Sequence, residues 1–124
     1  NLAIMMNRKK YEALPAAAKA AIDKCWDLRI DEPARQFFYL PLMHSENLCD
    51  QDRAVRLLAT RMPETGADNL RHAKAHRDVI RQFGRFPYRN EALGRATTQA
   101  ETDWMEAGGY ATTLKEVDAR SEAA

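Results

Sequence analysis

The sequence is poor in cysteine, in glycine and in long apolar runs, and each shortage excludes a class of protein. Its two cysteines, Cys25 and Cys49, lie far apart with no C-x-x-C motif, which excludes a disulfide framework and a zinc ribbon. No stretch approaches the roughly 18 uninterrupted apolar residues of a membrane span, and the start lacks the apolar core of a secretory signal. We therefore expect a soluble protein, without a membrane span, in the reducing cytoplasm.

The motifs that bind nucleotides or activate a serine are missing as well. The sequence contains neither G-x-x-x-x-G-K-[ST] nor G-x-G-x-x-G, and no G-x-S-x-G elbow surrounds Ser45. His72 and His76 have a spacing at which two imidazoles can share a metal, but Ala73 stands where a zinc helix would carry glutamate. We expect no metal and no other cofactor, and interpret His76 as a hydrogen-bonded core histidine.

The net charge of +1 hides an uneven distribution. Residues 71–95 carry seven bases and two acids, whereas residues 23–70 carry six bases and nine acids. A local surplus of bases attracts phosphate or carboxylate groups, or pairs with acidic segments of the same chain. Because the totals nearly cancel, the pattern favours pairing within the chain.

Four arginines recur every four residues between residues 77 and 89, with aromatic residues among them. Arginines beside aromatic rings are typical of proteins that bind single-stranded nucleic acid. Gly84 and Pro87 interrupt this run, however, so the arginines cannot form one continuous helical ridge. We do not expect nucleic acid binding.

Apolar residues recur at helical spacing along most of the chain. Pro15 suits a first helical turn, Ser45 is a good N-cap, and Gly84 is a typical helix stop. Thr98 and Glu101 form a capping-box pattern. The predicted helices are residues 14–28, a short buried apolar helix from Pro33 that Pro41 kinks or ends, residues 46–62, a helix from Asp68 or Asn69 to Phe83, and a last helix from Thr98 that Gly108 and Gly109 close.

No window shows the sustained period-two alternation of a strand. We predict an all-α fold: a single helical domain over residues 1–124, an antiparallel array of about five helices with short connections. The sequence beyond Tyr110 is polar and rich in alanine, and residues 111–124 are expected to be a frayed tail.

Polar residues lie beside apolar anchors in the segments HSE (44–46), HRD (76–78) and RN (89–90). Burying such groups is costly unless each finds a partner, so they predict a polar site between the third helix, the fourth helix and the turn that follows. Its candidate residues are His44, Glu46, His76, Arg77, Asp78, Arg85, Arg89 and Asn90.

Two interpretations of this site stay open. A structural role predicts a closed network in which these groups satisfy one another. A small-molecule site or enzyme predicts that His44, Glu46, His76 and Arg89 converge on one cavity, with His76 as acid or base and Arg85 and Arg89 as an anion clamp.

The segments FFYLPLMHSENLCDQDRAVRL and AHRDVIRQFGRFPYRNEALGR, followed by a threonine-glutamate helix start, resemble a bacterial family of unknown function, domain-of-unknown-function family 924. The resemblance covers roughly residues 26–110. It implies an all-helical, tetratricopeptide-like fold with no established activity, substrate or cofactor. The polar positions that it implies are His44, Ser45, Glu46, Asp50, Gln51, His76, Arg77, Asp78, Arg85, Arg89, Asn90 and Arg95.

Members of that family usually have an upstream half that this chain lacks. Residues 1–23 are more weakly similar to a helix-joining segment in the substrate-binding proteins of tripartite carboxylate transporters, which would make them a foreign or truncated segment. If a pocket shared between halves is open, an apolar face is exposed, so we expect self-association as a dimer or higher oligomer. The sequence thus favours a helical interaction or scaffold module, with a possible protein partner; the alternative is a small-molecule-binding protein or enzyme with a His/Arg site for an anionic ligand.

Overall fold

The computed structural model describes residues 8–123, and the side chains of residues 13–123. Within this range the chain forms helices and connecting turns and no strand, which confirms the all-α prediction. Five of its six α-helices are at least seven residues long. The elements are α2 (Arg8–Asp23), η1 (Trp26–Arg29), η2 (Ala34–Phe38), α3 (Leu40–Met43), α4 (Leu48–Arg61), α5 (Ala67–Phe83), η3 (Pro87–Arg89), α6 (Gln99–Glu106) and α7 (Tyr110–Ala123).

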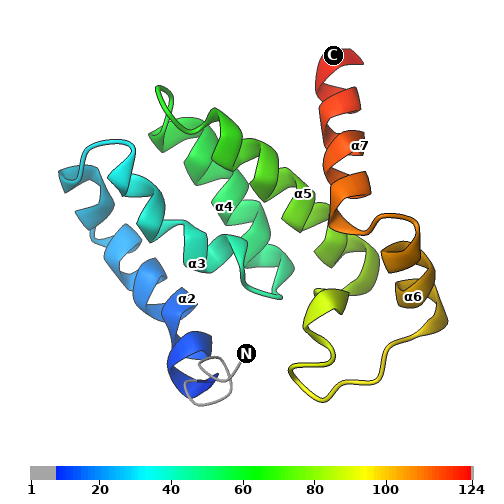
Figure 1. Ribbon diagram of the computed structural model, residues 1–124. Helices are drawn as coiled ribbons and strands as arrows, with labels where there is room; N and C mark the ends of the chain where they lie inside the picture. The colour runs from blue at the N-terminus through cyan, green and yellow to red at the C-terminus, as the bar shows by residue number, and fades with distance from the viewer. Residues whose placement is uncertain (1–7, 124) are drawn as a thin grey trace.

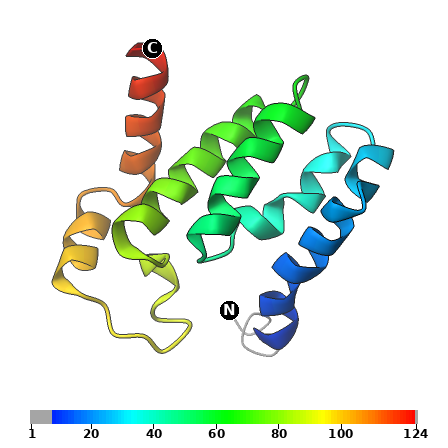
Figure 2. The same cartoon turned by 180° about the vertical axis from the view of Figure 1, so that it is seen from behind.

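The helices form an array with α4 and α5 at its centre (Figures 1 and 2). On one side lie α3 and then α2, and on the other side α7 packs against α5. The long turn after α5 carries η3 and leads into α6, which lies beside the start of α7. None of the helices in the described part of the chain is long and apolar enough to cross a membrane.

The core falls into two clusters that meet along α5. The larger cluster joins α2, α3, α4 and the first half of α5, and the smaller joins the second half of α5 to the turn that follows. Ala54 and Ala73 are fully buried, and their small side chains let α4 and α5 approach closely. Phe86 fills the second cluster and is also fully buried. The buried residues of the larger cluster are Ala18, Ile22, Tyr39, Leu42, Met43, Ala54, Leu57, Leu58, Met62 and Ala73.

The structure confirms two predicted helix boundaries and their capping residues, the end of α5 and the start of α6. Gly84 adopts a left-handed conformation with φ 74° and ends α5, where its N–H donates to the carbonyl of Ile80. A side chain at this φ would be strained. Thr98 and Glu101 form the expected capping box of α6.

Three other predicted boundaries are wrong. Asn47, not Ser45, caps α4 by accepting a hydrogen bond from the N–H of Asp50; the hydroxyl of Ser45 instead donates to the Asp50 side chain. The fourth helix begins at Ala67, before the predicted caps, and its N-cap is Gly66. Only glycine fits at that position, since a Cβ there would lie 2.4 Å from the Met62 carbonyl oxygen. Pro15 lies inside α2 and not in its first turn.

The predicted buried helix from Pro33 is two short elements, η2 and α3, and it is buried on one side alone. Tyr39 and Leu42 enter the core, whereas Phe37 is 67% exposed. Pro41 lies in the first turn of α3 and does not end it, because the ring's fixed φ is compatible with a helix start.

The end of the chain is a further correction. Where a frayed tail was predicted, α7 packs on α5 with Thr113 and Val117 buried. The guanidinium of Arg71 on α5 donates two hydrogen bonds to the carboxylate of Asp118 on α7, at 2.6 and 3.0 Å. The packing of α7 thus rests on two small buried side chains and cross-helix ion pairs, which hydrophobic periodicity does not detect.

Candidate functional site

Glu46 ties the loop before α4 to the turn after α5. Its carboxylate accepts two hydrogen bonds from the Arg95 guanidinium, at 2.7 and 3.0 Å, and one from the N–H of Phe86 at 2.6 Å. Burial alone would raise the pKa of Glu46, but the hydrogen bonds from Arg95 and Phe86 outweigh it and lower the pKa. The carboxylate is therefore ionised and held at neutral pH.

Glu101 connects the turn after α5 to the start of α6. Its side chain is nearly fully buried, accepts two hydrogen bonds from Arg85 at 2.7 and 2.8 Å, and accepts a third from the N–H of Thr98 at 2.9 Å. The hydrogen bonds from Arg85 and Thr98 lower the pKa of Glu101 to about 2. The same carboxylate therefore caps α6 and holds the Arg85 guanidinium in place.

Asn90 joins these two ion pairs. Its side-chain oxygen accepts from Nε of Arg95 at 3.0 Å, and its side-chain nitrogen donates to the Glu101 carboxylate at 3.5 Å and to the Thr97 hydroxyl at 3.2 Å. We call Glu46, Arg85, Asn90, Arg95 and Glu101 the polar corner. Each of its members has a hydrogen-bonded partner within it, and three of the eight candidate residues, Glu46, Arg85 and Asn90, belong to it.

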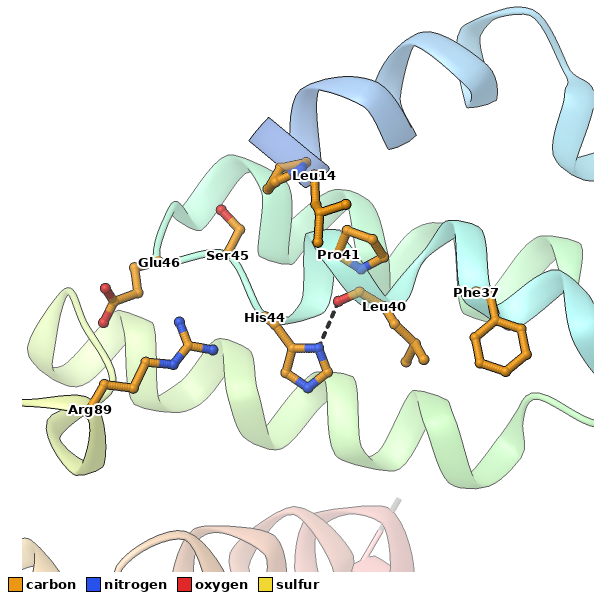
Figure 3. Close-up of a pocket in the computed structure, with 9 residues that line it drawn as sticks. Leu14, Phe37, Leu40, Pro41, His44, Ser45, Glu46 and Arg89 are labelled. Atoms are coloured by element: carbon orange, nitrogen blue, oxygen red, sulfur yellow. Dashed lines mark hydrogen bonds between the residues drawn. The ribbon is translucent and has the colours of Figure 1, made fainter. Parts of the chain in front are cut away.

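A separate cavity of about 470 Å³ lies beside the polar corner, between α2, η2, α3 and η3. We call it the α2–α3 groove; Figure 3 shows the side chains that line it. Five apolar residues form most of its wall, and His44, Ser45, Glu46 and Arg89 form one end. The apolar residues are Leu14, Pro15, Phe37, Leu40 and Pro41.

His44 enters this groove as a neutral hydrogen-bond acceptor. Its Nδ1 lies 2.9 Å from the carbonyl oxygen of Leu40 (Figure 3), and because a carbonyl can only accept, Nδ1 carries the proton. Burial lowers the pKa of His44, and the positive charge of Arg89 lowers it further. At neutral pH Nε2 is therefore left with a lone pair that can accept a hydrogen bond.

Arg89 supplies the positive charge at the polar end of the groove. Its guanidinium reaches from η3 toward His44 and Glu46 (Figure 3), and its charge contributes to lowering the pKa of both. The guanidinium carbon lies 4.5 Å from the centre of the Phe86 ring, a cation–π contact that orients the side chain.

His76 lies behind the groove and does not line it. Its Nδ1 donates to the carbonyl oxygen of His72 at 2.7 Å and lies 3.2 Å from the Tyr110 hydroxyl. Burial lowers the pKa of His76 to about 4, so the ring is neutral at neutral pH. Its ring meets that of His44 edge-on, at 5.2 Å between centres. The structure thus places His76 as the hydrogen-bonded core histidine of the sequence interpretation, supporting His44 from behind.

A family model described as "Bacterial protein of unknown function (DUF924)" matches residues 9–109. The chain belongs to the DUF924 family. The match includes residues 9–23, for which the sequence had suggested a foreign origin; residues 1–7 of that segment lie outside the described residues, and α2 packs on α3 as part of the same core.

One solved structure resembles that of this DUF924 protein. It is a protein of unknown function from Agrobacterium tumefaciens, 40% identical in sequence, and the superposition has a TM-score of 0.69. The match covers 79% of this chain and 53% of the other, so this chain spans about half the length of the structure it matches. A search of curated proteins finds no match.

The eight candidate residues of this DUF924 chain thus divide among four places. Glu46, Arg85 and Asn90 belong to the polar corner, His44, Arg89 and again Glu46 line the α2–α3 groove, and His76 lies between that groove and Tyr110. Arg77 and Asp78 lie elsewhere, on the side of α5 that faces α7. The structure therefore does not bring Arg85 and Arg89 together as a clamp, because Arg85 is held by Glu101.

Sequence reasoning missed Glu101 and Tyr110 as members of polar contacts. Glu101 was visible as a helix cap alone, and its second function depends on Arg85, sixteen positions earlier. Tyr110 gave no signal, although its hydroxyl lies 2.6 Å from Nδ1 of His72. Within the described residues, no three His, Cys, Asp or Glu side chains are placed to hold a metal ion.

Proposed function

We propose that this helical module binds a small ligand with an apolar body and an anionic head in the α2–α3 groove. The observation that carries the proposal is the convergence of His44, Glu46 and Arg89 on one end of an apolar cavity. The small-molecule interpretation of the sequence predicted that four residues line one cavity; these three do, and His76 does not. The groove supports binding and positioning of a ligand, and we propose no reaction.

The size and lining of the groove suit such a ligand. Small-molecule sites are typically clefts of roughly 300–1,000 Å³ with mostly apolar walls and a few convergent polar groups. The groove, at about 470 Å³, lies in this range. Phe37 and Leu40 on one wall, with Leu14 on the other, would enclose a short alkyl or aromatic body (Figure 3).

The charges at the polar end favour an anion. Glu46 is neutralised by its two hydrogen bonds from Arg95, and His44 is neutral because burial lowers its pKa. Arg89 brings a positive charge to the same end of the groove, where it acts on both His44 and Glu46. A carboxylate head would be held by a charge-assisted hydrogen bond to the guanidinium, and Nε2 of His44 would accept from a neighbouring O–H or N–H of the ligand.

Straight-chain carboxylates test this proposal. Hexanoate, octanoate and decanoate, each beside the alcohol of the same length, are titrated into isotope-labelled protein and followed by NMR. We expect saturable shifts at Leu14, Leu40 and His44, with each carboxylate binding more tightly than its alcohol. Equal binding of acid and alcohol, or no saturable binding of any of them, would contradict the proposal.

Substitution of Arg89 measures how much the anionic head group of the ligand contributes to its affinity. Arg89→Gln removes the charge and should weaken carboxylate binding about tenfold while leaving alcohol binding unchanged. Arg56→Gln is the matched control, because Arg56 is exposed on α4 and lines neither this groove nor the cavity beside α7.

A second candidate function, self-association, rests on a different set of residues. Trp26, Leu28 and Ile30 are between 41% and 47% exposed on the outer side of the array. Lys24 and Arg29 lie in the same stretch as Asp23 and Asp31, so this surface carries both signs of charge, which suits a self-complementary two-fold contact.

Light scattering at micromolar concentration tests the self-association. We expect a dimer or higher oligomer that the double variant Leu28→Ser, Ile30→Ser converts to a monomer. Met105→Ser, which removes an apolar residue 37% exposed on α6, should leave the mass unchanged. A monomeric parent protein would contradict this candidate.

We also propose a cytoplasmic location. Cys25 and Cys49 are both exposed and form no disulfide, and exposed thiols of this kind suit a reducing compartment.

A further inference from the structure

A second cavity, of about 510 Å³, lies between α5 and α7 and is lined mainly by cations. None of its residues lines the α2–α3 groove or belongs to the polar corner. We call it the α5–α7 cleft. Its lining residues are Lys74, Arg77, Asp78, Arg81, Val117, Arg120 and Ser121.

The helices explain why these cations meet. Lys74, Arg77 and Arg81 follow one another at intervals of three and four residues, so they project from one face of α5. Arg120 reaches the same space from α7, which runs beside α5 (Figures 1 and 2).

The acids around the cleft do not balance this charge. Asp78 accepts from Arg120 and lies 3.8 Å from Arg81, and Asp52 lies 3.5 Å from Arg77 and 3.7 Å from Arg81. Four cations therefore face two carboxylates, which leaves two positive charges in excess. The adjacent Asp118 does not alter this balance, because it is paired with Arg71.

The guanidinium groups in the cleft also keep hydrogen-bonding capacity. The distances of 3.5–3.8 Å from Arg77 and Arg81 to their acids exceed the 2.7–3.2 Å of a good N–H···O bond. Nε of Arg77 is buried and has no hydrogen-bond partner among the described residues. In contrast, Arg85 in the polar corner donates to Glu101 at 2.7 and 2.8 Å.

We infer that the α5–α7 cleft binds a small anion that carries phosphate groups. A phosphate offers several acceptor oxygens to planar guanidinium donors, and a diphosphate brings at least two negative charges to match the excess. The Ser121 hydroxyl at the edge of the cleft adds a donor. The site is independent of the ligand proposed for the α2–α3 groove.

Calorimetric titration with inorganic pyrophosphate at low salt tests the inference. We expect saturable binding of one pyrophosphate per chain, weakened at least tenfold by Arg77→Gln and by Arg81→Gln. Arg56→Gln, which removes the same charge outside both cavities, should change the affinity less than twofold. Lys74→Gln, at the rim, gives an additional variant if Arg77→Gln fails to fold.

Two further ligands distinguish the source of the phosphate. ADP should compete with pyrophosphate, and adenosine should not bind, because the phosphates and not the base are recognised. A short oligothymidylate that binds where pyrophosphate does not would indicate a nucleic acid surface and overturn the inference. Equal weakening by Arg56→Gln and Arg77→Gln, or no saturable binding, would overturn it too.

Discussion

Arginines from one short stretch of sequence, residues 77–95, serve the polar corner and the α5–α7 cleft in opposite ways. In the polar corner, Arg85 and Arg95 each hold a carboxylate through two hydrogen bonds of 2.7–3.0 Å. In the cleft, Arg77 and Arg81 lie 3.5–3.8 Å from the acids nearest to them. Tight two-point pairing indicates a structural role, whereas loose pairing in a cavity leaves donors for a ligand.

The largest effect should come from the centre of the polar corner. Glu101→Gln leaves the partly buried Arg85 without its counter-charge and weakens the cap of α6, and breaking such a pair on one side is strongly destabilising. We expect the melting temperature to fall by on the order of 10 °C. Asp103→Asn, an exposed change on the same helix, should shift it by about 2 °C or less; equal shifts would remove the distinction between the two regions.

A second contrast separates the buried histidine from the groove arginine. His76→Ala removes a ring that packs on Phe86, His44 and Tyr110 and should lower the free energy of unfolding by about 2–4 kcal/mol. Arg89→Ala should cost about 1 kcal/mol or less. Urea denaturation measures both, and a larger loss for Arg89→Ala would place that residue in the structural network.

Acid should weaken the polar corner in a defined range of pH. The folded pKa of Glu101 is lowered to about 2 from a usual value near 4.5, so its contribution to stability is complete above pH 4.5 and is lost as the pH falls toward 2. The difference in melting temperature between the parent protein and Glu101→Gln should therefore shrink over that range. A difference that is constant from pH 6 to pH 3 would contradict this account of the carboxylate.

The smallest effect is expected in the cleft. Arg77→Gln and Arg81→Gln remove charges that repel one another and are only loosely paired, so each should change the free energy of unfolding by no more than about 0.5 kcal/mol. Thermal unfolding in low salt checks this. A loss comparable to that of Glu101→Gln would show that the cleft cations are structural.

Local sequence signals predicted the features that depend on neighbouring residues. Gly84 ends α5 because a left-handed residue is needed there, and Thr98 with Glu101 forms a capping box within four positions. The burial of His76 followed from its position between apolar residues on one helix face. Residues within a few positions of each other determine these features, so the sequence alone predicts them.

The remaining features depend on partners far away in the sequence. Glu46 pairs with Arg95 across 49 positions, and nothing near Glu46 distinguishes this partner from Arg85 or Arg89. Both Ser45 and Asn47 are good N-caps, and the choice is settled by Ser45 donating to Asp50. The groove itself depends on how α2 lies against α3, which periodicity within either helix does not specify.

The polar corner is a structural network, and we propose that the α2–α3 groove beside it is a binding site. The most direct test is an NMR titration of octanoate into the parent protein, Arg89→Gln and Arg85→Gln, each at a temperature where it is folded. We expect Arg89→Gln to weaken octanoate binding about tenfold and Arg85→Gln to bind octanoate as the parent protein does. Equal weakening by both variants, or by neither, would contradict the proposal.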